Sequence, residues 1–498
     1  MKKIILLFSF VILTFSFYSD SYSNNLKISN YTVSGQLTSA QTLYLKIENI
    51  SWDNSWRNDI PGPGFSVPNN YDAVWIFAKF RKRGTSDWLP MKFSPQVSDH
   101  IIPLNSEIKT YQDSMGVMLY RKSNGTGTFS AINTLLKWRY AGYLSNTDTI
   151  DVKLFGIEMV YVPQGSFYVG DYTPSNVTGQ FVSNDNVSPY QITSENSITL
   201  GGNGVNNLKS RNNQGMSTAD DFTDAQTQTL PQTFPKGYND FFAMKYEVSM
   251  DAYVDFLNCL SETQANSRYP ASAFGFERFN IEKVGNTYRT PSPDRAVNMM
   301  AWSDCAAYLD WTGLRPFTEL EYEKMCRGPL TVVSNEYAWG NTNVVQIVNY
   351  SGVDSLGTVL PLPDSANCQY NLVDGGMSQF IQGPVRVGIF ATANSNRTKA
   401  GASYYGIMEL SGNTWERPVT VGNSTGRQFI NIHGNGLLTA NGDADVQTWP
   451  GVNSVGSGFR GGNWFRGTLR LRVADRFYAN TPLDNRTSHR GIRGVRAN

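Results

Sequence analysis

The sequence is poor in the side chains that build most catalytic metal centres. It contains 3 histidines among 498 residues, His100, His433 and His489, and none has a histidine three or four positions away. Catalytic iron and zinc commonly take several imidazole ligands at close spacing. A histidine-rich metal site is therefore not expected in this chain.

Cysteine is equally scarce. The 4 cysteines are Cys259, Cys305, Cys326 and Cys368. In an exported protein four cysteines allow three disulfide pairings, and the spacing does not choose among them. A structural role, as disulfides or as buried thiols, is favoured over a catalytic one.

The chain also lacks a charge imbalance and, after its first residues, a long apolar run. Lys and Arg number 42 against 41 Asp and Glu, a formal net charge of +1. No overall field attracts nucleic acid or acidic lipid, so nucleic acid is not an expected partner. No stretch beyond the N-terminus is apolar enough for a membrane helix, so we expect no transmembrane segment.

Residues 1–23 have the pattern of a cleaved signal peptide. Lys2 and Lys3 precede an apolar run over 4–17, and Ser21-Tyr22-Ser23 supplies small residues at the cleavage position. The run is short for a transmembrane helix. We expect a secreted or cell-surface protein.

Residues 24–155 read as all-β. Leu43, Leu45 and Ile47 alternate with polar neighbours, and residues 74–81 alternate in the same way, which predicts half-buried strands. Asn124-Gly125 marks a tight turn before a further strand. Short strands at this spacing predict a β-sandwich domain.

Two tryptophans in this part have two interpretations. Trp52 and Trp56 lie in the segment WDNSWRND. They form either a glycan-stacking surface or aromatic packing at a strand end, and packing is favoured.

The second part, 156–498, contains a polar insertion over 171–233, in which Asn, Gly, Ser, Thr and Asp dominate. We expect it to lie on the surface with little core of its own. Three helices follow, with Ser249 and Ser303 as caps of the first two and Thr318 with Glu321 as the capping box of the third.

Seven segments of this part occur in a recognisable order. They are 156–171 (GIEMVYVPQGSFYVGD), 241–258 (FFAMKYEVSMDAYVDFLN), 296–328, 337–341 (YAWGN), 405–416 (YGIMELSGNTWE), 458–467 (GFRGGNWFRG) and 491–496 (GIRGVR). Together they resemble the formylglycine-generating enzyme family, also called sulfatase-modifying factor domains. The resemblance covers 156–498 and does not extend to 24–155.

The resemblance implies an α+β, loop-rich variant of the C-type lectin fold with structural calcium. Members of the family use copper and oxygen to convert a cysteine of client sulfatases into formylglycine. Relatives with the same fold serve as ligand-binding proteins or as components of surface machinery, so the fold alone does not fix the function.

The copper site that the resemblance implies has lost its ligands. Cu(I) selects sulfur, yet Arg466 and Thr468 stand where the family places its two cysteines, and Asn463 replaces a serine before them. The resemblance also pairs Cys326 with a cysteine near Val473, where none exists. Copper and formylglycine synthesis are therefore not expected.

The calcium segment persists. By resemblance its ligands are Glu409, Gly412, Thr414 and Glu416, which combine carboxylates with backbone carbonyls as Ca²⁺ prefers. A second calcium site would begin at Asn349-Tyr350, with its later ligands in the divergent stretch 361–377.

The former copper segment remains a candidate ligand-binding surface. It combines Asn463 and Trp464 with Arg466, Arg470 and Arg472, groups that suit carboxylates, sulfates or sugar rings. The alternative is that these arginines make salt bridges within the domain.

Three functions follow for comparison. The leading hypothesis is an exported, two-domain, non-catalytic protein that binds a protein or glycan partner. The second is a copper- and oxygen-dependent oxidase acting on client sulfatases, which requires Cys305, Cys326 or Cys368 to reach the cleft. The third is a diversified ligand-binding receptor.

Overall fold

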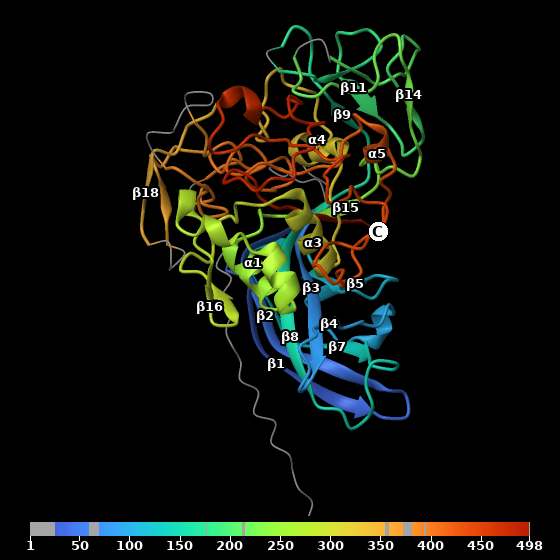
Figure 1. Cartoon of the computed structure of the whole chain (residues 1–498), viewed down its shortest axis with the longest axis vertical. Helices are drawn as coiled ribbons and strands as arrows, with labels where there is room; N and C mark the ends of the chain where they lie inside the picture. The colour runs from blue at the N-terminus through green and yellow to red at the C-terminus, as the bar shows by residue number, and fades with distance from the viewer. Residues whose placement is uncertain are drawn as a thin grey trace, which may run out of the picture.

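The structure is a computed structural model that describes residues 25–58, 69–175, 177–211, 215–353, 358–371, 381–392 and 395–497. The signal segment lies outside these ranges, so export stays a prediction. Strands of the N-terminal part form one end of the molecule, and a loop-rich part with short helices forms the other (Figure 1). Within the described ranges no helix is long and apolar enough to span a membrane.

One ten-stranded antiparallel sheet runs through the molecule in the order β1-β2-β3-β8-β15-β20, with β7 paired to β2 and with β4 and β6 paired to β3, while β5 pairs with β6. Its strands are β1 (Lys27–Leu37), β2 (Thr42–Asn58), β3 (Asn70–Lys82), β4 (Leu89–Pro90), β5 (Ser106–Thr110), β6 (Val117–Arg121), β7 (Gly125–Arg139), β8 (Ile150–Val162), β15 (Phe241–Met244) and β20 (Val495–Ala497). The fold is thus α+β and rich in sheet.

The alternation predicted for residues 43–47 is confirmed. Leu43, Leu45 and Ile47 of β2 are buried. They share a core with Val74 of β3 and Leu136 of β7, so apolar faces from different strands enclose this core.

Strand β3 is buried on both faces, and the prediction of a half-buried strand there is wrong. Val74 and Ile76 face the N-terminal core, whereas Trp75 and Phe77 belong to the large core that also holds the helices. Both alternating sets of β3 are hydrophobic, and a strand between two packed layers reads this way.

Of the two tryptophans of β2, Trp52 is buried and Trp56 is half-buried. Trp52 is 1% exposed and its indole N–H donates to Asp72 at 2.8 Å. The indole of Trp56 donates to Asn70 at 2.7 Å, and the ammonium of Lys245 lies 4.6 Å from its ring centroid. The packing interpretation is confirmed for Trp52, and Trp56 packs as a half-buried ring against a core cluster.

The sheet crosses the expected boundary between the two parts. Strand β8 spans position 155 and pairs with β3 on one side and β15 on the other. Across the same junction the indole of Trp75 donates to the Thr312 carbonyl at 2.8 Å, and the ammonium of Lys79 donates to the Trp311 carbonyl at 2.7 Å. The N-terminal strands are therefore anchored in the second part, and the division at 155 stays a prediction.

The insertion at 171–233 is more deeply packed than the sequence predicts. Its strands are β10 (Phe181–Val182), β11 (Tyr190–Ile192), β12 (Ile198–Leu200), β13 (Lys209–Ser210) and β14 (Gln228–Leu230); β11 pairs with β9 (Phe167–Val169). Phe181, Ile192, Leu200, Phe222 and Leu230 are buried in the large core. The polar composition of the insertion gave no sign of these buried side chains, which pack the insertion against the rest of the domain.

Two of the three predicted helix starts are confirmed. Helix α1 (Met250–Leu257) is capped by the Ser249 hydroxyl, which accepts from the amide of Ala252. Helix α4 (Glu319–Arg327) has the capping box of Thr318 and Glu321. The described part also contains helix α2 (Glu262–Arg268), which the sequence analysis missed.

Helix α3 (Trp302–Thr312) starts before its predicted cap. Its N-cap is Ala301, whose amide donates to the carboxylate of Asp304, and Ser303 lies in the first turn. Ser303 donates instead through its amide and its hydroxyl to Asp484. Asp304, at the third helical position, thus caps the helix in place of the predicted Ser303.

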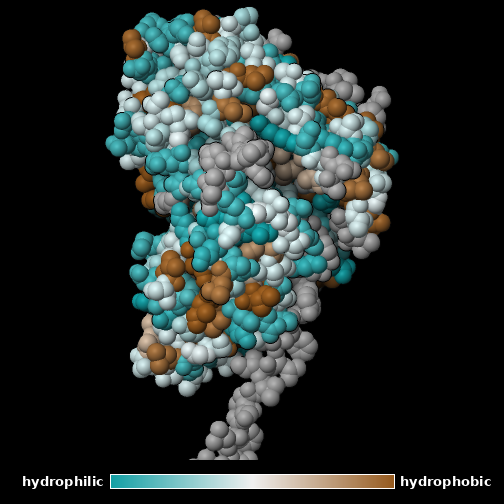
Figure 2. Space-filling view, turned by 180° about the vertical axis from the view of Figure 1, so that it is seen from behind, coloured by the Kyte–Doolittle hydropathy of each residue, from teal (hydrophilic) through white to brown (hydrophobic). Residues whose placement is uncertain are grey.

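The remaining elements are short. They are η1 (Val97–Asp99), η3 (Ala271–Ala273), η4 (Phe276–Arg278), β16 (Glu282–Val284), β17 (Thr287–Arg289), β18 (Asn349–Ser351), β19 (Leu360–Leu362), α5 (Ser424–Arg427) and η6 (Thr468–Leu471). The reverse side of the molecule is largely hydrophilic, with hydrophobic side chains gathered over the half that holds the N-terminal strands (Figure 2). Ile101, Leu104 and Ile132 of that part are more than half exposed, at 55%, 92% and 59%.

Candidate functional site

Buried ion pairs attach the start of the segment 460–476 to helix α4. The guanidinium of Arg460 is fully buried and donates to Glu319 at 3.1 Å and to Glu323 at 2.6 Å, both on α4. Charges removed from water require such partners. Arg460 therefore fixes the start of the segment on α4.

The end of the segment is fixed by the insertion. The guanidinium of Arg476 is buried between Asp220, at 2.7 Å, and Glu319, at 2.8 Å. The amide of Arg476 donates to the Thr178 carbonyl, and the amide of Thr178 donates to Asp475. The insertion thus holds the segment in place.

Two residues of the expected binding surface lie in the interior. Trp464 is 1% exposed and its indole donates to the Ser488 carbonyl at 2.9 Å. Asn463 is fully buried, and its side-chain oxygen accepts from the amides of Phe465 and Arg466 at 2.7 and 2.9 Å. Both shape the turn and present no side chain to a ligand, which corrects their assignment to an open surface.

The arginines of the segment divide between the two interpretations. Arg470 makes an ion pair with Asp475 at 3.1 Å and stacks 3.7 Å from the ring centroid of Phe477, as the salt-bridge alternative expects. Arg472 donates to the side-chain oxygen of Asn335 at 2.7 Å. These two arginines serve the fold.

Arg466 is half-buried, as Arg470 and Arg472 are, and its guanidinium lies among aromatic rings. It donates to the Tyr478 hydroxyl at 2.9 Å, and its guanidinium carbon lies 5.9 and 5.5 Å from the ring centroids of Phe465 and Tyr478. Phe465 in turn stacks on His489 at 5.9 Å. We call Phe465, Arg466, Tyr478 and His489 the arginine–aromatic patch.

The patch lies in a positive environment. Burial, followed by the charges of Arg490 and Arg466, lowers the pKa of His489 to about 3. The imidazole is therefore neutral at physiological pH, and an anion is the kind of ligand that this environment favours. The sequence analysis identified Arg466 but not the other three members. Tyr478 and His489 lie 12 and 23 positions beyond Arg466 in loops with no periodic signal, and Phe465 has no charge or motif that marks it.

Three buried glutamates meet beside the calcium segment. Glu416 accepts from the guanidinium of Arg493 at 2.6 Å. Glu247 of the β15–α1 connection accepts from the amide and hydroxyl of Thr414 at 2.9 and 2.6 Å. The sequence analysis missed Glu247, because it lies far from Glu409 and Glu416 in the sequence and no motif links it to them.

Glu409 is the third carboxylate of this group. One oxygen accepts from the Gly388 amide at 2.8 Å, and the other is buried without a hydrogen-bond partner among the described residues. Burial raises the pKa of Glu409 to about 7. This oxygen is the one buried carboxylate oxygen without a partner among the three glutamates in the described residues.

The second calcium segment lies elsewhere. Asn349 and Tyr350 belong to β18, where the hydroxyl of Tyr350 accepts from Arg278 at 3.1 Å. The later ligands were expected in 361–377, of which 372–377 lie outside the described residues. Among the described side chains, no group of three or more His, Cys, Asp or Glu is arranged to hold a metal.

All four cysteines are buried free thiols. The thiols of Cys305 and Cys368 donate to the carbonyls of Gly491 and Ser411 at 3.3 and 3.2 Å. Burial raises the pKa of Cys259 to about 11 and that of Cys305 and Cys326 to about 12. At neutral pH these groups remain thiols.

Comparison with known proteins agrees with this architecture. The model of the sulfatase-modifying factor enzyme 1-like domain matches residues 153–498. The chain belongs to this family. The sulfatase-modifying factor domain thus includes the candidate segment, the acidic cluster and all four cysteines.

Two similar proteins give weaker information. The formylglycine-generating enzyme of Bos taurus is 28% identical over 128 residues, which cover 20% of this chain and 33% of the bovine enzyme. The solved structure of Treponema denticola variable protein 1 covers 69% of this chain and 96% of its own, at 13% identity and a TM-score of 0.31. The aligned stretch thus spans a third of the bovine enzyme.

The copper chemistry of the sulfatase-modifying factor family does not fit these residues. Arg466 and Thr468 offer a guanidinium and a hydroxyl where two thiolates are required. The remaining thiols are buried and protonated, and the thiolate is the form that binds metal. Cys326 packs in one core with Val473, the position of its expected partner, as an unpaired thiol.

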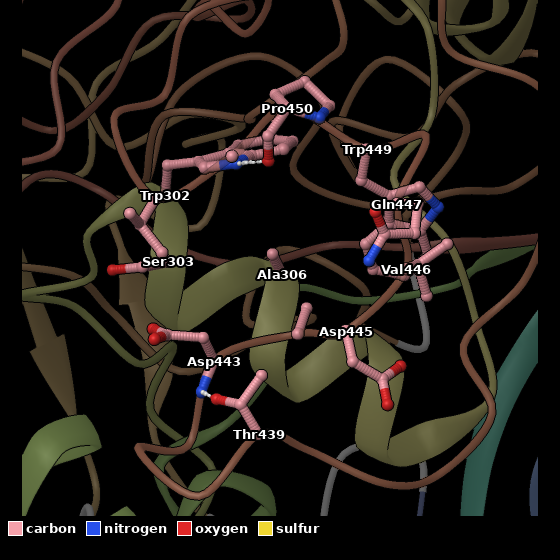
Figure 3. Close-up of a pocket in the computed structure, with 13 residues that line it drawn as sticks. Trp302, Ser303, Ala306, Thr439, Asp443, Asp445, Val446, Gln447, Trp449 and Pro450 are labelled. Atoms are coloured by element: carbon pink, nitrogen blue, oxygen red, sulfur yellow. Dashed lines mark hydrogen bonds between the residues drawn. The ribbon is translucent and has the colours of Figure 1, made fainter.

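A hollow of about 240 Å³ lies beside helix α3 (Figure 3). Trp302 and Ala306 of α3 face Trp449 across it. Its acids are engaged elsewhere, since Asp443 pairs with Arg268 at 2.9 Å and Asp445 accepts from a neighbouring asparagine. The hollow therefore presents no group poised for catalysis.

Proposed function

We propose that this chain is an exported, non-catalytic member of the sulfatase-modifying factor family that binds a protein or glycan partner at or outside the cell surface. One observation carries the proposal. The positions of the copper ligands hold Arg466 and Thr468, and every thiol of the chain is buried and protonated. Without an accessible thiolate the oxidase alternative has no metal ligand, and it is not favoured.

The arginine–aromatic patch is the proposed contact for the partner. Its guanidinium lies over aromatic rings and its histidine is neutral. Arg466 supplies planar donors for carboxylates or sulfates, and Phe465 and Tyr478 supply rings for sugar or side-chain stacking. A partner with anionic groups on a glycan or an acidic peptide suits this combination.

The finer architecture belongs to the same proposal. The two apolar faces that enclose the N-terminal core support a β-sandwich ahead of a C-type-lectin-like domain. The buried oxygen of Glu409, beside Glu416 and Glu247, supports structural calcium at 409–416, with backbone carbonyls as further ligands. Calcium would hold loops that cannot satisfy their own backbone groups.

The test uses the purified mature protein on arrays of sulfated glycans and acidic peptides. Binding should be lost on Arg466→Ala and retained on Arg139→Ala, which removes an exposed arginine of β7 far from the patch. In parallel, a cysteine-containing sulfatase peptide is incubated with the protein, Cu(I) and oxygen. Formation of formylglycine on that peptide, read by mass spectrometry, would refute the non-catalytic assignment.

A further inference from the structure

Two buried arginines outside the patch flank one phenylalanine. Arg417 and Arg490 are 2% and 4% exposed. Their guanidinium carbons lie 4.2 and 4.8 Å from the ring centroid of Phe459. Guanidinium groups stay charged at physiological pH, so two positive charges lie in the interior here.

Each guanidinium has hydrogen-bond acceptors for only some of its nitrogens within the described ranges. Arg417 donates to the Ser457 hydroxyl at 3.3 Å and to the Leu483 carbonyl at 3.0 Å, while its Nε and Nη1 have no partner in the described ranges. Arg490 donates from Nη1 to the carbonyl and side-chain oxygens of Asn485, and its Nε also lacks a partner there. Three guanidinium nitrogens are thus buried without an acceptor in the described ranges.

The nearby acids offset these charges only in part, since burial lowers the pKa of both arginines by more than the charge of Asp484 raises it. Asp484 accepts from the amide and hydroxyl of Ser303, and Asp304 pairs with Arg268 and Arg486. Neither aspartate makes an ion pair with either arginine in the described part of the chain. Burial, followed by the charge of Arg417, lowers the pKa of Arg490 to about 9, which indicates that the two guanidiniums repel each other.

We propose that Arg417 and Arg490 form a binding site for a small inorganic anion, an oxyanion such as sulfate or phosphate or else a halide. Buried charges are normally paired, and an unpaired buried ion costs several kcal/mol. An anion would accept from the orphaned N–H groups and cancel the mutual repulsion. Because both side chains are buried, the proposed ligand is a small ion and not a carboxylate of a macromolecule.

The hollow beside α3 lies next to this site. Trp302 forms part of its wall, and the guanidinium carbon of Arg417 lies 5.6 Å from the indole centroid of the same residue. Ser303 lines the same hollow (Figure 3), and its amide and hydroxyl donate to Asp484. The hollow and Arg417 therefore lie on either side of the buried Trp302 side chain.

The experiment is calorimetric titration of the full mature chain with sodium sulfate and, separately, sodium chloride at constant ionic strength. We expect saturable binding of one ion, weakened at least about tenfold by Arg417→Gln and by Arg490→Gln. The exposed-arginine variant Arg139→Gln should bind as the wild type. Saturation by sulfate alone identifies an oxyanion site, and saturation by chloride alone identifies a halide site.

Equal heats for the wild type and both glutamine variants would overturn the proposal. If the variants fail to fold, wild-type crystals grown with bromide give a direct answer. Crystals grown with selenate test the oxyanion in the same way. Anomalous density of either ion within hydrogen-bond reach of Arg417 Nε or Nη1 supports the site, and its absence with both ions refutes it.

Discussion

Lys79 links the N-terminal strands to the sulfatase-modifying factor domain, and its titration should control stability at alkaline pH. Its side chain is fully buried on β3, and the ammonium donates to the carbonyls of Trp311 at 2.7 Å and Gly436 at 2.9 Å. Burial lowers the pKa of Lys79 to about 7 from its ordinary value of 10.5. The perturbation we consider is Lys79→Met at several pH values.

The sign follows from proton binding. Between pH 7 and 10.5 the unfolded chain keeps Lys79 protonated while the folded protein releases the proton, so the free energy of unfolding rises with pH. Below pH 7 both states are protonated and the contribution is constant. Each pKa unit corresponds to about 1.36 kcal/mol, so raising the pH from 7 to 9 should add about 2–3 kcal/mol through Lys79.

The assay is urea unfolding at pH 7, 8 and 9. Relative to Lys79→Met, the wild type should gain about 2–3 kcal/mol of unfolding free energy over this range. The control variant Lys122→Met removes an exposed lysine and should follow the wild type. Equal pH dependence of the wild type and Lys79→Met would show that Lys79 is solvated and that the two parts are not packed as described.

Three further predictions concern the segment and the thiols. At pH 8 in native conditions, Cys305 and Cys326 should react with a thiol reagent at least about a thousandfold more slowly than free cysteine, because their pKa lies near 12; rapid labelling that precedes unfolding would contradict this. Arg476→Gln should lower the free energy of unfolding by about 3–5 kcal/mol in urea, because it leaves buried carboxylates uncompensated. Trp464→Ala should lower the free energy of unfolding by about 3–5 kcal/mol, because the indole is buried, whereas Arg466→Ala should change it by no more than about 0.5 kcal/mol. A larger loss of thermal stability for Arg466→Ala than for Trp464→Ala would contradict the burial described for these two residues.

Local patterns predicted the elements whose signal is local. The Ser249 cap and the box of Thr318 and Glu321 were predictable because both partners lie within three residues. The cap of α3 failed because Ser303 is drawn to Asp484, which is 181 residues away in the sequence. Tertiary partners of this kind leave no trace in local spacing.

The residues of the candidate segment differ in how far the sequence indicated their environment. Arg466 is half-buried, whereas Trp464 is 1% exposed. The sequence could not predict the burial of Trp464, because an aromatic residue near a pair of loop glycines occurs both in cores and on surfaces. Glu247 joins Glu416 and Glu409 only through the fold. The contact of Asp220 with Arg476 was equally hidden, because the insertion's polar composition gave no sign of a buried anchor.

The most direct test of the account is the metal content of the purified mature protein after exposure to Cu(I) and Ca²⁺ and removal of loosely bound ions. The account predicts retained calcium, lost on Glu409→Gln, and no stoichiometric copper. Stoichiometric copper that disappears on Cys305→Ser or Cys326→Ser would contradict it, because the oxidase chemistry would then have moved to other thiols of the chain.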